Sequence, residues 1–388
     1  MSHQLDLSRT SHMDVLGLDI GGANLKAASL SGQARSLAWP LWRHPVGLAE
    51  QLRELLAEFP TCPRVAVTMT AELCDCFPDK STGVRHILDN VCRALPQSEI
   101  QVWTHTDEFF SVPHACERPH LVAAANWRAL ARFAARVVQD VLPTDWPDRS
   151  SPKYTDGESE SKRTSVAPPH GQWELLLDVG STTTDLIPLR EGELATNSRS
   201  DWERIQRGEL LYLGARRTPL CALVPCFRWK DTLIYTAAEY FADFYDALLM
   251  LRLVPEQPDY ILTADGRPAT FSAARQRLAR MLCADAHEVS DEVLVALAEA
   301  ALSAWEERFR KTWQQVLRTF STPPRGVILA GEGEILARHG LGQVRYDGRI
   351  ISLEEIFGSA ISRCACAYAA AWLLDRYGNS KVAHGSSA

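Results

Sequence analysis

Two acidic residues bracket a turn that is rich in glycine and hydroxyl groups. The stretch reads Asp178-Val179-Gly180-Ser181-Thr182-Thr183-Thr184-Asp185 and lies between two short apolar runs. Short apolar runs bounded by turn residues predict the two buried strands of a hairpin. Gly180 leaves room for a ligand near the backbone, and the N–H groups and hydroxyls of residues 181–184 can bind an anion such as phosphate. Asp178 and Asp185 can hold a cation that neutralises this anion.

Two further turns resemble this one. The first reads Asp19-Ile20-Gly21-Gly22-Ala23-Asn24-Leu25-Lys26, and the other reads Ala330-Gly331-Glu332-Gly333-Glu334. The second of these follows an apolar run and opens a helix, a position suited to an anion or a nucleotide. One glycine turn alone is weak evidence, because any tight turn favours glycine. Together the three turns predict two related lobes with a phosphate site between them.

The apolar patterns between the turns predict the elements that position them. A buried strand over residues 64–69 runs into a polar cluster at residues 68–75, and ligands bind at such carboxyl ends of strands in open α/β sheets. Helices are predicted over Ser81–Leu95, with Ser81 as the cap, over Ala237–Leu251 and over Gly358–Tyr377.

Composition and charge narrow the class of protein. The chain has 388 residues, of which 46% are hydrophobic and 23% are charged, which is enough for two lobes with cores of their own. A net charge of −7 gives no basic surface for nucleic acid. No apolar run is long enough to span a bilayer, and the N-terminus lacks the apolar segment of a secretory signal, so a cytoplasmic location is expected. The cysteines form no C-x-x-C pair, which argues against a zinc site.

Shifts in composition divide the chain into four parts. We expect a disordered tail over residues 1–13, a first lobe over 14–141, a flexible insertion over 142–171 and a second lobe over 172–388. The insertion is dominated by Pro, Ser, Asp, Lys and Glu, which cannot bury a core. The last helix of the second lobe is expected to pack back on the first lobe.

Three longer motifs connect the chain to a known superfamily. They are Ala125-Asn126-Trp127-Arg128-Ala129, Gly214-Ala215-Arg216-Arg217-Thr218-Pro219 and Ala264-Asp265-Gly266-Arg267-Pro268-Ala269-Thr270. With the three turns, they resemble the actin, sugar kinase and Hsp70 superfamily, and more narrowly its hydantoinase A/oxoprolinase-like branch. Within that branch the chain is similar to proteins of tetrahydromethanopterin-linked one-carbon pathways, including methanofuran biosynthesis. The resemblance implies a two-lobed, ribonuclease H-like α/β fold with a cleft between the lobes.

The resemblance also implies a transferase reaction that joins two halves of a methanofuran precursor. A phenol of the γ-glutamyltyramine type attacks an aminomethylfuran that carries a diphosphate, and pyrophosphate leaves. Mg²⁺ and oriented N–H donors would stabilise the charge that develops on the diphosphate. ATP is not required, because the substrate already carries the leaving group. The expected partners are therefore small molecules, with no nucleic acid and no membrane, and the oligomeric state stays open.

Residue roles follow from the chemistry of this reaction. Magnesium is assigned to Asp19, Asp178 and Asp185. Phosphate oxygens are assigned to Gly21, Gly22, Asn24, Lys26, Gly180, Ser181, Thr182, Thr183, Arg216, Arg217, Gly331 and Gly333. The catalytic set is Asp178 and Asp185 together with Glu72 and Asp75, either of which could take the phenolic proton. Substrate contacts are assigned to Asn126, Trp127, Asp265 and Arg267.

Several of these roles have structural alternatives. The two arginines could form surface ion pairs, Asp265 and Arg267 could cap a turn, and Trp127 could be a core residue. The function also has alternatives. An ATP-dependent hydantoinase-like or oxoprolinase-like hydrolase, or a small-molecule kinase, would hold ATP on residues 180–183 and adenine near residues 331–333. A non-catalytic nucleotide-binding protein is the third reading.

Overall fold

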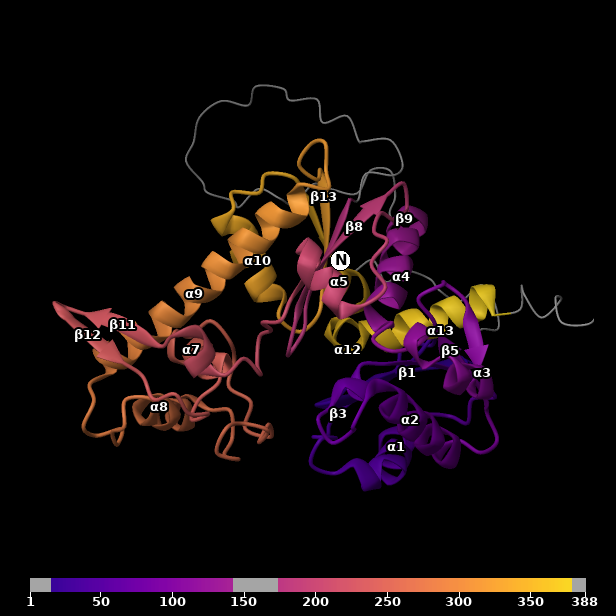
Figure 1. Ribbon diagram of the computed structural model, residues 1–388, viewed down its shortest axis with the longest axis horizontal. Coiled ribbons are helices and arrows are strands. Elements are labelled where there is room, and N and C mark those ends of the chain that lie inside the picture. The colour runs from indigo at the N-terminus through magenta and orange to yellow at the C-terminus, as the bar shows by residue number, and fades with distance from the viewer. Residues whose placement is uncertain (1–14, 142–173, 379–388) are drawn as a thin grey trace, which may run out of the picture. The chain divides into compact units, whose positions relative to one another are not determined.

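A computed structural model describes residues 15–141 and 174–378, which divide into two compact units (Figure 1). Of the described residues, the first unit comprises 15–140 and 353–378, and the second comprises 141 and 174–352. The first unit is therefore built from two segments of the chain, one before and one after the second unit.

The domain limits expected from the sequence differ from these units at the end of the second lobe. The tail at residues 1–13 and the insertion at residues 142–171 lie outside the described residues. The expected second lobe extends to residue 388, whereas in the structure the residues from Leu353 onward group with the first unit. No helix among the described residues is long and apolar enough to cross a membrane.

The first unit is built on a six-stranded mixed sheet in the order β3-β2-β1-β4-β5-β6. The strands β1, β4 and β5 are parallel, and β2, β3 and β6 run antiparallel to their neighbours. The strands are β1 (Val15–Ile20), β2 (Asn24–Ser29), β3 (Ala34–Ala38), β4 (Arg64–Met69), β5 (Glu99–Trp103) and β6 (Phe109–Ser111). The helices are α1 (Leu48–Leu56), α2 (Lys80–Ala94), α3 (Val112–Glu117), α4 (Asn126–Val141), α11 (Leu353–Phe357), α12 (Ser359–Arg363) and α13 (Ala365–Tyr377).

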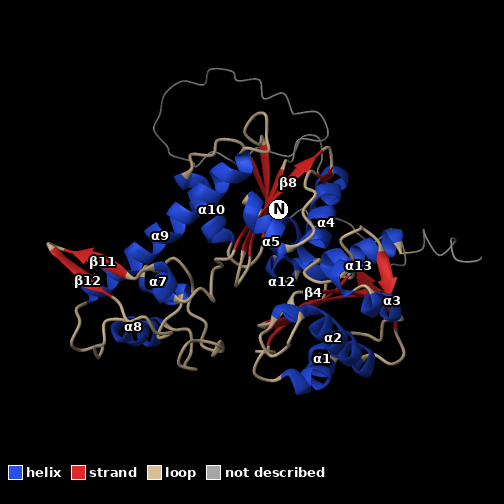
Figure 2. Ribbon diagram, in the orientation of Figure 1, coloured by secondary structure: helices blue, strands red, loops and turns tan. Residues whose placement is uncertain are grey.

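Helices cover both faces of this sheet (Figure 2). Leu16, Leu18 and Ile20 of β1 pack into the core that includes residues of α1 and α2. The alternate residues of a strand point to the other face, and there Val15 packs with residues of α13. A Cβ atom on Gly17 would lie 1.8 Å from the carbonyl oxygen of Ala367, so glycine permits the close approach of α13 to β1.

The second unit repeats this sheet plan in the order β10-β8-β7-β13-β14. The strands are β7 (Leu175–Val179), β8 (Thr184–Arg190), β10 (Leu210–Leu211), β13 (Gly326–Ala330) and β14 (Arg349–Ser352), with β9 (Glu193–Leu194) paired to β8. Strands β11 (Cys226–Trp229) and β12 (Thr232–Tyr235) form a separate ribbon. The helices are α5 (Asp201–Arg207), α6 (Leu220–Leu223), α7 (Phe244–Met250), α8 (Phe271–Arg280), α9 (Asp291–Leu317) and α10 (Glu334–Gln343).

The two sheets confirm the predicted fold class. In each, a central strand pairs antiparallel with the next strand in the chain and parallel with a later one: β1 with β2 and β4, and β7 with β8 and β13. In both units a further strand pairs with the outer edge of this hairpin, β3 with β2 and β10 with β8. This strand order is that of the ribonuclease H-like fold. The protein therefore has the two-lobed α/β fold of the actin, sugar kinase and Hsp70 type.

Three predicted helix boundaries were wrong. The helix α2 begins at Lys80, because Asp79 rather than Ser81 accepts the hydrogen bond of an N-cap from Thr82. The helix α7 begins only at Phe244, because Asp243 and Asp246 form a capping box that starts it there. The predicted final helix is divided at Cys364 into α12 and α13. Apolar periodicity detects such helices but not the polar residues that begin them.

Candidate functional site

The hydroxyl-rich turn of the second unit is a hairpin turn between β7 and β8. The N–H of Gly180 donates to the carbonyl of Thr183 at 2.9 Å, and Asp178 lies directly opposite Asp185 in the ladder. Residues paired in this way project from the same face of a sheet. Asp178 is half-buried, and Asp185 is buried. The hairpin therefore presents two carboxylates beside a turn that carries three hydroxyl groups.

Asp185 is bound by an arginine that the sequence analysis missed. Arg204 on α5 donates from Nη2 to Oδ1 of Asp185, and both side chains are buried. Burial raises the pKa of Asp185, although the charge and hydrogen bond of Arg204 act against the rise. The guanidinium of Arg204 therefore compensates the charge of this buried carboxylate.

The three carboxylates assigned to magnesium are divided between the units. Asp19 lies in the first unit, and Asp178 and Asp185 lie in the second. Within residues 15–141 and 174–378, no group of three or more His, Cys, Asp or Glu side chains is arranged to hold a metal ion. Magnesium commonly keeps several waters and binds through one or two carboxylates together with substrate phosphates. Asp178, next to the hydroxyl-rich turn, fits that mode of binding.

The segment 213–219 supports the hairpin turn. Its backbone N–H groups donate to two carbonyls of the turn, from Ala215 to Gly180 at 2.9 Å and from Arg216 and Arg217 to Ser181 at 3.0 and 2.9 Å. A Cβ atom on Gly214 would lie 2.4 Å from the nitrogen of Thr182, so this segment and the turn are in direct backbone contact. The predicted arginine pair is therefore brought next to the predicted anion turn.

The third glycine turn abuts Asp178. Gly331 has φ of +90°, and a Cβ atom there would lie 2.3 Å from Oδ1 of Asp178 and 2.4 Å from the carbonyl oxygen of Val179. The N–H of Gly333 donates to the same carbonyl at 2.8 Å. Two of the three turns picked out from the sequence are thus adjacent in one unit, and glycine is required where they meet.

Arg216 joins the two turns through its side chain. Its Nε donates to Glu332 at 2.9 Å and its Nη2 donates to Gln257 at 2.9 Å. The guanidinium carbon lies 4.3 Å from the ring centre of Tyr245 and 4.7 Å from that of Tyr260. Through these contacts, Arg216 connects the 331–333 turn with Gln257 and two tyrosine rings. The two tyrosines belong to no motif that the sequence analysis used.

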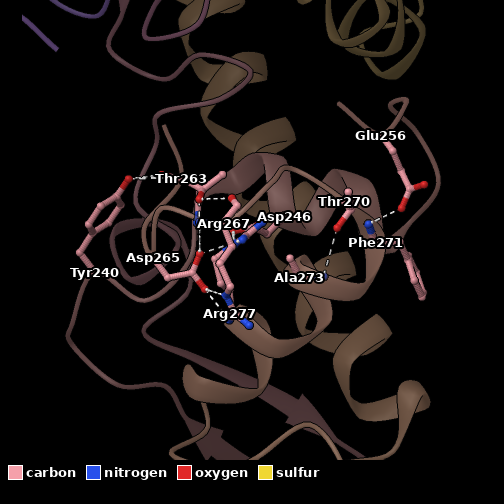
Figure 3. Close-up of polar contacts among 11 residues, drawn as sticks. Tyr240, Asp246, Glu256, Thr263, Asp265, Arg267, Thr270, Phe271, Ala273 and Arg277 are labelled. Atoms are coloured by element: carbon pink, nitrogen blue, oxygen red, sulfur yellow. Dashed lines mark hydrogen bonds and ion pairs between the residues drawn. The ribbon is translucent and has the colours of Figure 1, made fainter. Parts of the chain in front are cut away.

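Asp265 and Arg267 belong to a network of ion pairs (Figure 3). Asp265 accepts hydrogen bonds from the backbone N–H and Nε of Arg267 at 3.1 and 2.8 Å and from Nη1 of Arg277 at 3.0 Å. Arg277 is fully buried and also donates to Asp246. Burial opposes ionisation of Asp265, but the hydrogen bonds of Arg267 and the charge of Arg277 outweigh it and lower the pKa to about 2. This network holds the loop before α8, which favours the structural reading of the pair.

The hairpin turn of the first unit has the same backbone hydrogen bond as that of the second unit, but the residues paired beside it carry different charges. The N–H of Gly21 donates to the carbonyl of Asn24 at 3.0 Å, and Asp19 lies opposite Lys26. Burial raises the pKa of Asp19, and the charge of Lys26 opposes that rise. A carboxylate is therefore paired with an ammonium where the second unit has two carboxylates.

The candidate bases Glu72 and Asp75 follow the end of β4. The N–H of Thr70 donates to the carbonyl of Ile20 at 3.0 Å, which holds this segment beside the first hairpin. Glu72 is 1% exposed, and a Cβ atom on Gly83 of α2 would lie 2.7 Å from its Cα. Asp75 is exposed. The two carboxylates thus differ in access to solvent.

Asn126 and Trp127 lie at the start of α4. The side-chain oxygen of Asn126 accepts a hydrogen bond from the N–H of Trp127 at 2.8 Å. Trp127 is 3% exposed, and its ring lies 6.0 Å from that of His105. The neighbouring Arg128 binds Asp107 through two hydrogen bonds of 2.6 and 2.7 Å. These contacts favour the reading of Trp127 as a core residue.

The chain is similar to two proteins of one named activity. It is 28% identical over 366 residues to the (4-{4-[2-(gamma-L-glutamylamino)ethyl]phenoxymethyl}furan-2-yl)methanamine synthase of Methanocaldococcus jannaschii, which covers 93% of this chain and 98% of that protein. It is 30% identical over 210 residues to the synthase of the same name from Methanococcus vannielii, covering 54% of this chain and 93% of that protein. No protein-family model matches the chain.

The fold is also found in a solved structure of low sequence identity. A nucleotide-free structure of acetone carboxylase matches 91% of this chain and 70% of its own with a TM-score of 0.50 and 10% identity. That likeness concerns the fold alone. By the sequence similarity, in contrast, the chain belongs to the family of the (4-{4-[2-(gamma-L-glutamylamino)ethyl]phenoxymethyl}furan-2-yl)methanamine synthases.

Proposed function

We propose that this protein is a transferase of methanofuran biosynthesis. It joins the phenolic oxygen of γ-glutamyltyramine to the methylene carbon of an aminomethylfuran that carries a diphosphate. The carbon–oxygen bond of the ether forms, the bond between the methylene and the diphosphate breaks, and pyrophosphate leaves with the electron pair. The phenolic proton passes to a base on the protein.

The observation that carries this proposal is the similarity to the Methanocaldococcus jannaschii synthase over 93% of this chain and 98% of that protein. The name of that protein contains a phenoxymethyl group attached to a furan, so its product holds an ether between a phenol and a furan methylene. An ether of this kind forms by attack of the phenol on a methylene that bears a leaving group. Diphosphate is the leaving group that the turns of this chain suit best.

The second unit supplies groups that suit a diphosphate. Residues 180–183 offer backbone N–H groups and three hydroxyls, and Arg217 lies on the segment that hydrogen-bonds to this turn. Oriented donors of this kind stabilise negative charge where it develops as the leaving group departs. Asp178 would hold a magnesium ion, which when bound would neutralise part of the diphosphate charge.

ATP-dependent chemistry is the competing function. The adjacency of the 331–333 turn and Asp178 would suit a nucleotide as well as a diphosphate, since both need a site for phosphates at a turn. On this reading, the chain would act as a hydantoinase-like or oxoprolinase-like hydrolase, or as a kinase. The kinship with hydantoinase A, which the sequence motifs suggest, is likewise a proposal.

A pyrophosphate-release assay separates these functions. The purified protein is mixed with γ-glutamyltyramine, the aminomethylfuran diphosphate and Mg²⁺, without ATP, and the ether is identified by mass spectrometry. We expect one pyrophosphate for each ether formed. Ether formation only in the presence of ATP would favour the competing function, and no ether under either condition would refute the proposal.

A pair of variants tests the role of Asp178 in the same assay. Asp178→Asn removes a carboxylate at almost constant volume and is expected to lower kcat by about 100-fold or more, as loss of one electrostatic contact to a developing charge does. The exposed Asp347→Asn is the control and should retain full activity. Wild-type turnover by Asp178→Asn would rule out this residue as a ligand to the metal or the diphosphate.

A further inference from the structure

We propose that Tyr240 and Asp243 form a proton relay that deprotonates the phenol of the acceptor substrate. The proposal rests on the function proposed above and assigns the base to the second unit. The sequence pattern instead favours Glu72 or Asp75 as the base, and neither Tyr240 nor Asp243 belongs to a motif that it marks.

The geometry of the pair is that of a relay from solvent to a buried base. The hydroxyl of Tyr240 donates to both carboxylate oxygens of Asp243, at 3.0 and 3.1 Å. Asp243 is 5% exposed, whereas Tyr240 is 46% exposed. Tyr240 is thus the more accessible residue of the pair, and its hydroxyl oxygen can accept a hydrogen bond while it donates its proton to the carboxylate. Figure 3 shows Tyr240 beside the Asp265 network.

The charges around Asp243 explain why it can act as a base near neutral pH. Burial and the neighbouring carboxylate of Asp246 raise its pKa to about 8, against the effects of Tyr240, Arg277 and Arg217. Arg277 donates its hydrogen bonds to Asp246 and Asp265. A general base is most efficient when its pKa lies near the working pH.

The relay lies one chain segment away from the anion turn. Arg217 donates from its backbone to Ser181 of the turn at 2.9 Å. On the other side of the same segment, Thr218 accepts a hydrogen bond from the N–H of Phe244 at 2.8 Å, and Pro219 pairs with Asp243. The segment 217–219 therefore links the turn proposed to bind the diphosphate of one substrate with the base proposed to take the proton of the other.

The proton balance of the step is simple. The phenolic O–H of the acceptor breaks and its proton moves to the oxygen of Tyr240, while the proton of Tyr240 moves to Asp243. The phenolate oxygen forms the new bond to the methylene carbon as the diphosphate leaves. Asp243 later returns its proton to solvent through Tyr240. No oxidant or further reactant is needed.

The structural role of Asp243 provides a matched variant. Its side chain caps α7 by accepting the hydrogen bond of the capping box, and asparagine caps helices about as well as aspartate. Asp243→Asn therefore keeps the cap and removes the base. Tyr240→Phe removes the outer hydroxyl, and Tyr235→Phe, at a tyrosine that is 74% exposed on β12, is the control.

The test compares these variants in the ether-forming assay, with unfolding temperatures as a check on folding. We expect Asp243→Asn and Tyr240→Phe each to lower kcat/KM by about 100-fold or more, the range of general base catalysis. The wild-type rate should rise with pH and level off above about 8, following the carboxylate, and Asp243→Asn should lose this rise. Tyr235→Phe should match the wild type in every respect.

A more acidic acceptor substrate distinguishes a catalytic role of the pair from a structural one. Ring-fluorinated γ-glutamyltyramine ionises more readily, so it needs a base less, and both variants should recover part of their lost rate with it. Wild-type rates in both variants, an equal loss with either acceptor, or a defect in Asp243→Asn alone would overturn the relay. A wild-type protein that forms no ether from either acceptor would instead overturn the proposed function, and the relay with it.

Discussion

Arg216 is the residue whose side-chain contacts tie the second unit's turns together. It is held between two tyrosine rings and donates to Glu332 and Gln257. A lysine would keep the charge but lose the planar fork and the stacking that these contacts require. The role of Arg216 is therefore sensitive to a substitution that conserves charge.

Arg216→Lys is expected to lower the free energy of unfolding by about 1.5–3 kcal/mol, the range for hydrogen bonds to charged groups. Urea unfolding followed by circular dichroism measures this value. The control is Arg325→Lys, whose side chain is 61% exposed in its pair with Glu174, and it should change the free energy by about 0.5 kcal/mol or less. Equal effects of the two substitutions would show that the contacts of Arg216 contribute no more than a surface pair.

Asp265 links stability to pH through its network with the arginines. Its pKa is about 2 in the folded protein and close to 3.9 in an unfolded chain. A carboxyl group with a lowered folded pKa stabilises the fold above its unfolded pKa, and this contribution is lost as the pH falls toward the folded value.

The difference in unfolding free energy between the wild type and Asp265→Asn should therefore be largest above pH 5 and shrink between pH 4 and pH 2. Urea unfolding of both proteins at a series of pH values checks this. A difference that stays constant with pH would mean that the charge of Asp265 contributes nothing to stability. Asp285→Asn provides a comparison at an aspartate outside this network.

The sequence identified the residues of the anion turn because they are contiguous. Asp178, Gly180 and Asp185 form one motif, and the structure keeps them together. Arg204 contacts Asp185, and Tyr245 and Tyr260 contact Arg216, each from a separate part of the chain. A local sequence pattern cannot predict such contacts. Asp243 did carry a signal, because an acid followed by another acid three residues later can mark a helix start, but apolar periodicity masked it.

At the scale of elements, the contact between β7 and the 331–333 turn depends on glycine. Gly331 combines a positive φ with a site where a Cβ atom would meet both Asp178 and the backbone of Val179. Backbone cannot move aside as a flexible side chain can, so any larger residue must displace the turn.

Gly331→Ala is expected to lower the free energy of unfolding by at least about 1 kcal/mol, the cost of a strained backbone conformation, and to impair ether formation. Gly342→Ala is the matched control, since Gly342 lies within α10 with open space around it. Alanine there should leave activity unchanged and raise stability slightly, as alanine favours helix. A harmless Gly331→Ala would show that the turn can shift without consequence for the site.

At the level of elements, the two hairpins were predictable from the sequence, and the helix starts were not. The paired acid–glycine turns indicated two similar hairpins, and both appear as β1–β2 and β7–β8. The helix starts depend on single hydrogen bonds, such as the one from Thr82 to Asp79, which compete with other polar residues nearby. Which of several neighbouring polar residues caps the helix depends on tertiary packing, and a sequence pattern does not show that packing.

At the scale of the whole molecule, the second unit has the features of an independent domain. Its six-stranded sheet and its core, which includes Trp305 and Phe309 on α9, come entirely from one stretch of chain. A continuous segment with its own core can fold alone.

We expect the fragment of residues 174–352 to fold cooperatively when produced alone. Circular dichroism and urea unfolding would show a helix-rich spectrum and a single transition. The fragment of residues 15–141 is the comparison, and it should fail to unfold cooperatively because it lacks α13. A stable 15–141 fragment, or an unstructured 174–352 fragment, would contradict this assignment of the two units.

The packing of α13 against Gly17 has a consequence for biosynthesis. Strand β1 is covered on one face by α13, which is synthesised after the whole of the second unit. Until α13 has been synthesised, the apolar face that includes Val15 and Ala66 stays uncovered on the nascent chain, while the segment in between can already fold. A nascent chain that stalls or is truncated before α13 would therefore expose an apolar sheet face to chaperones and proteases.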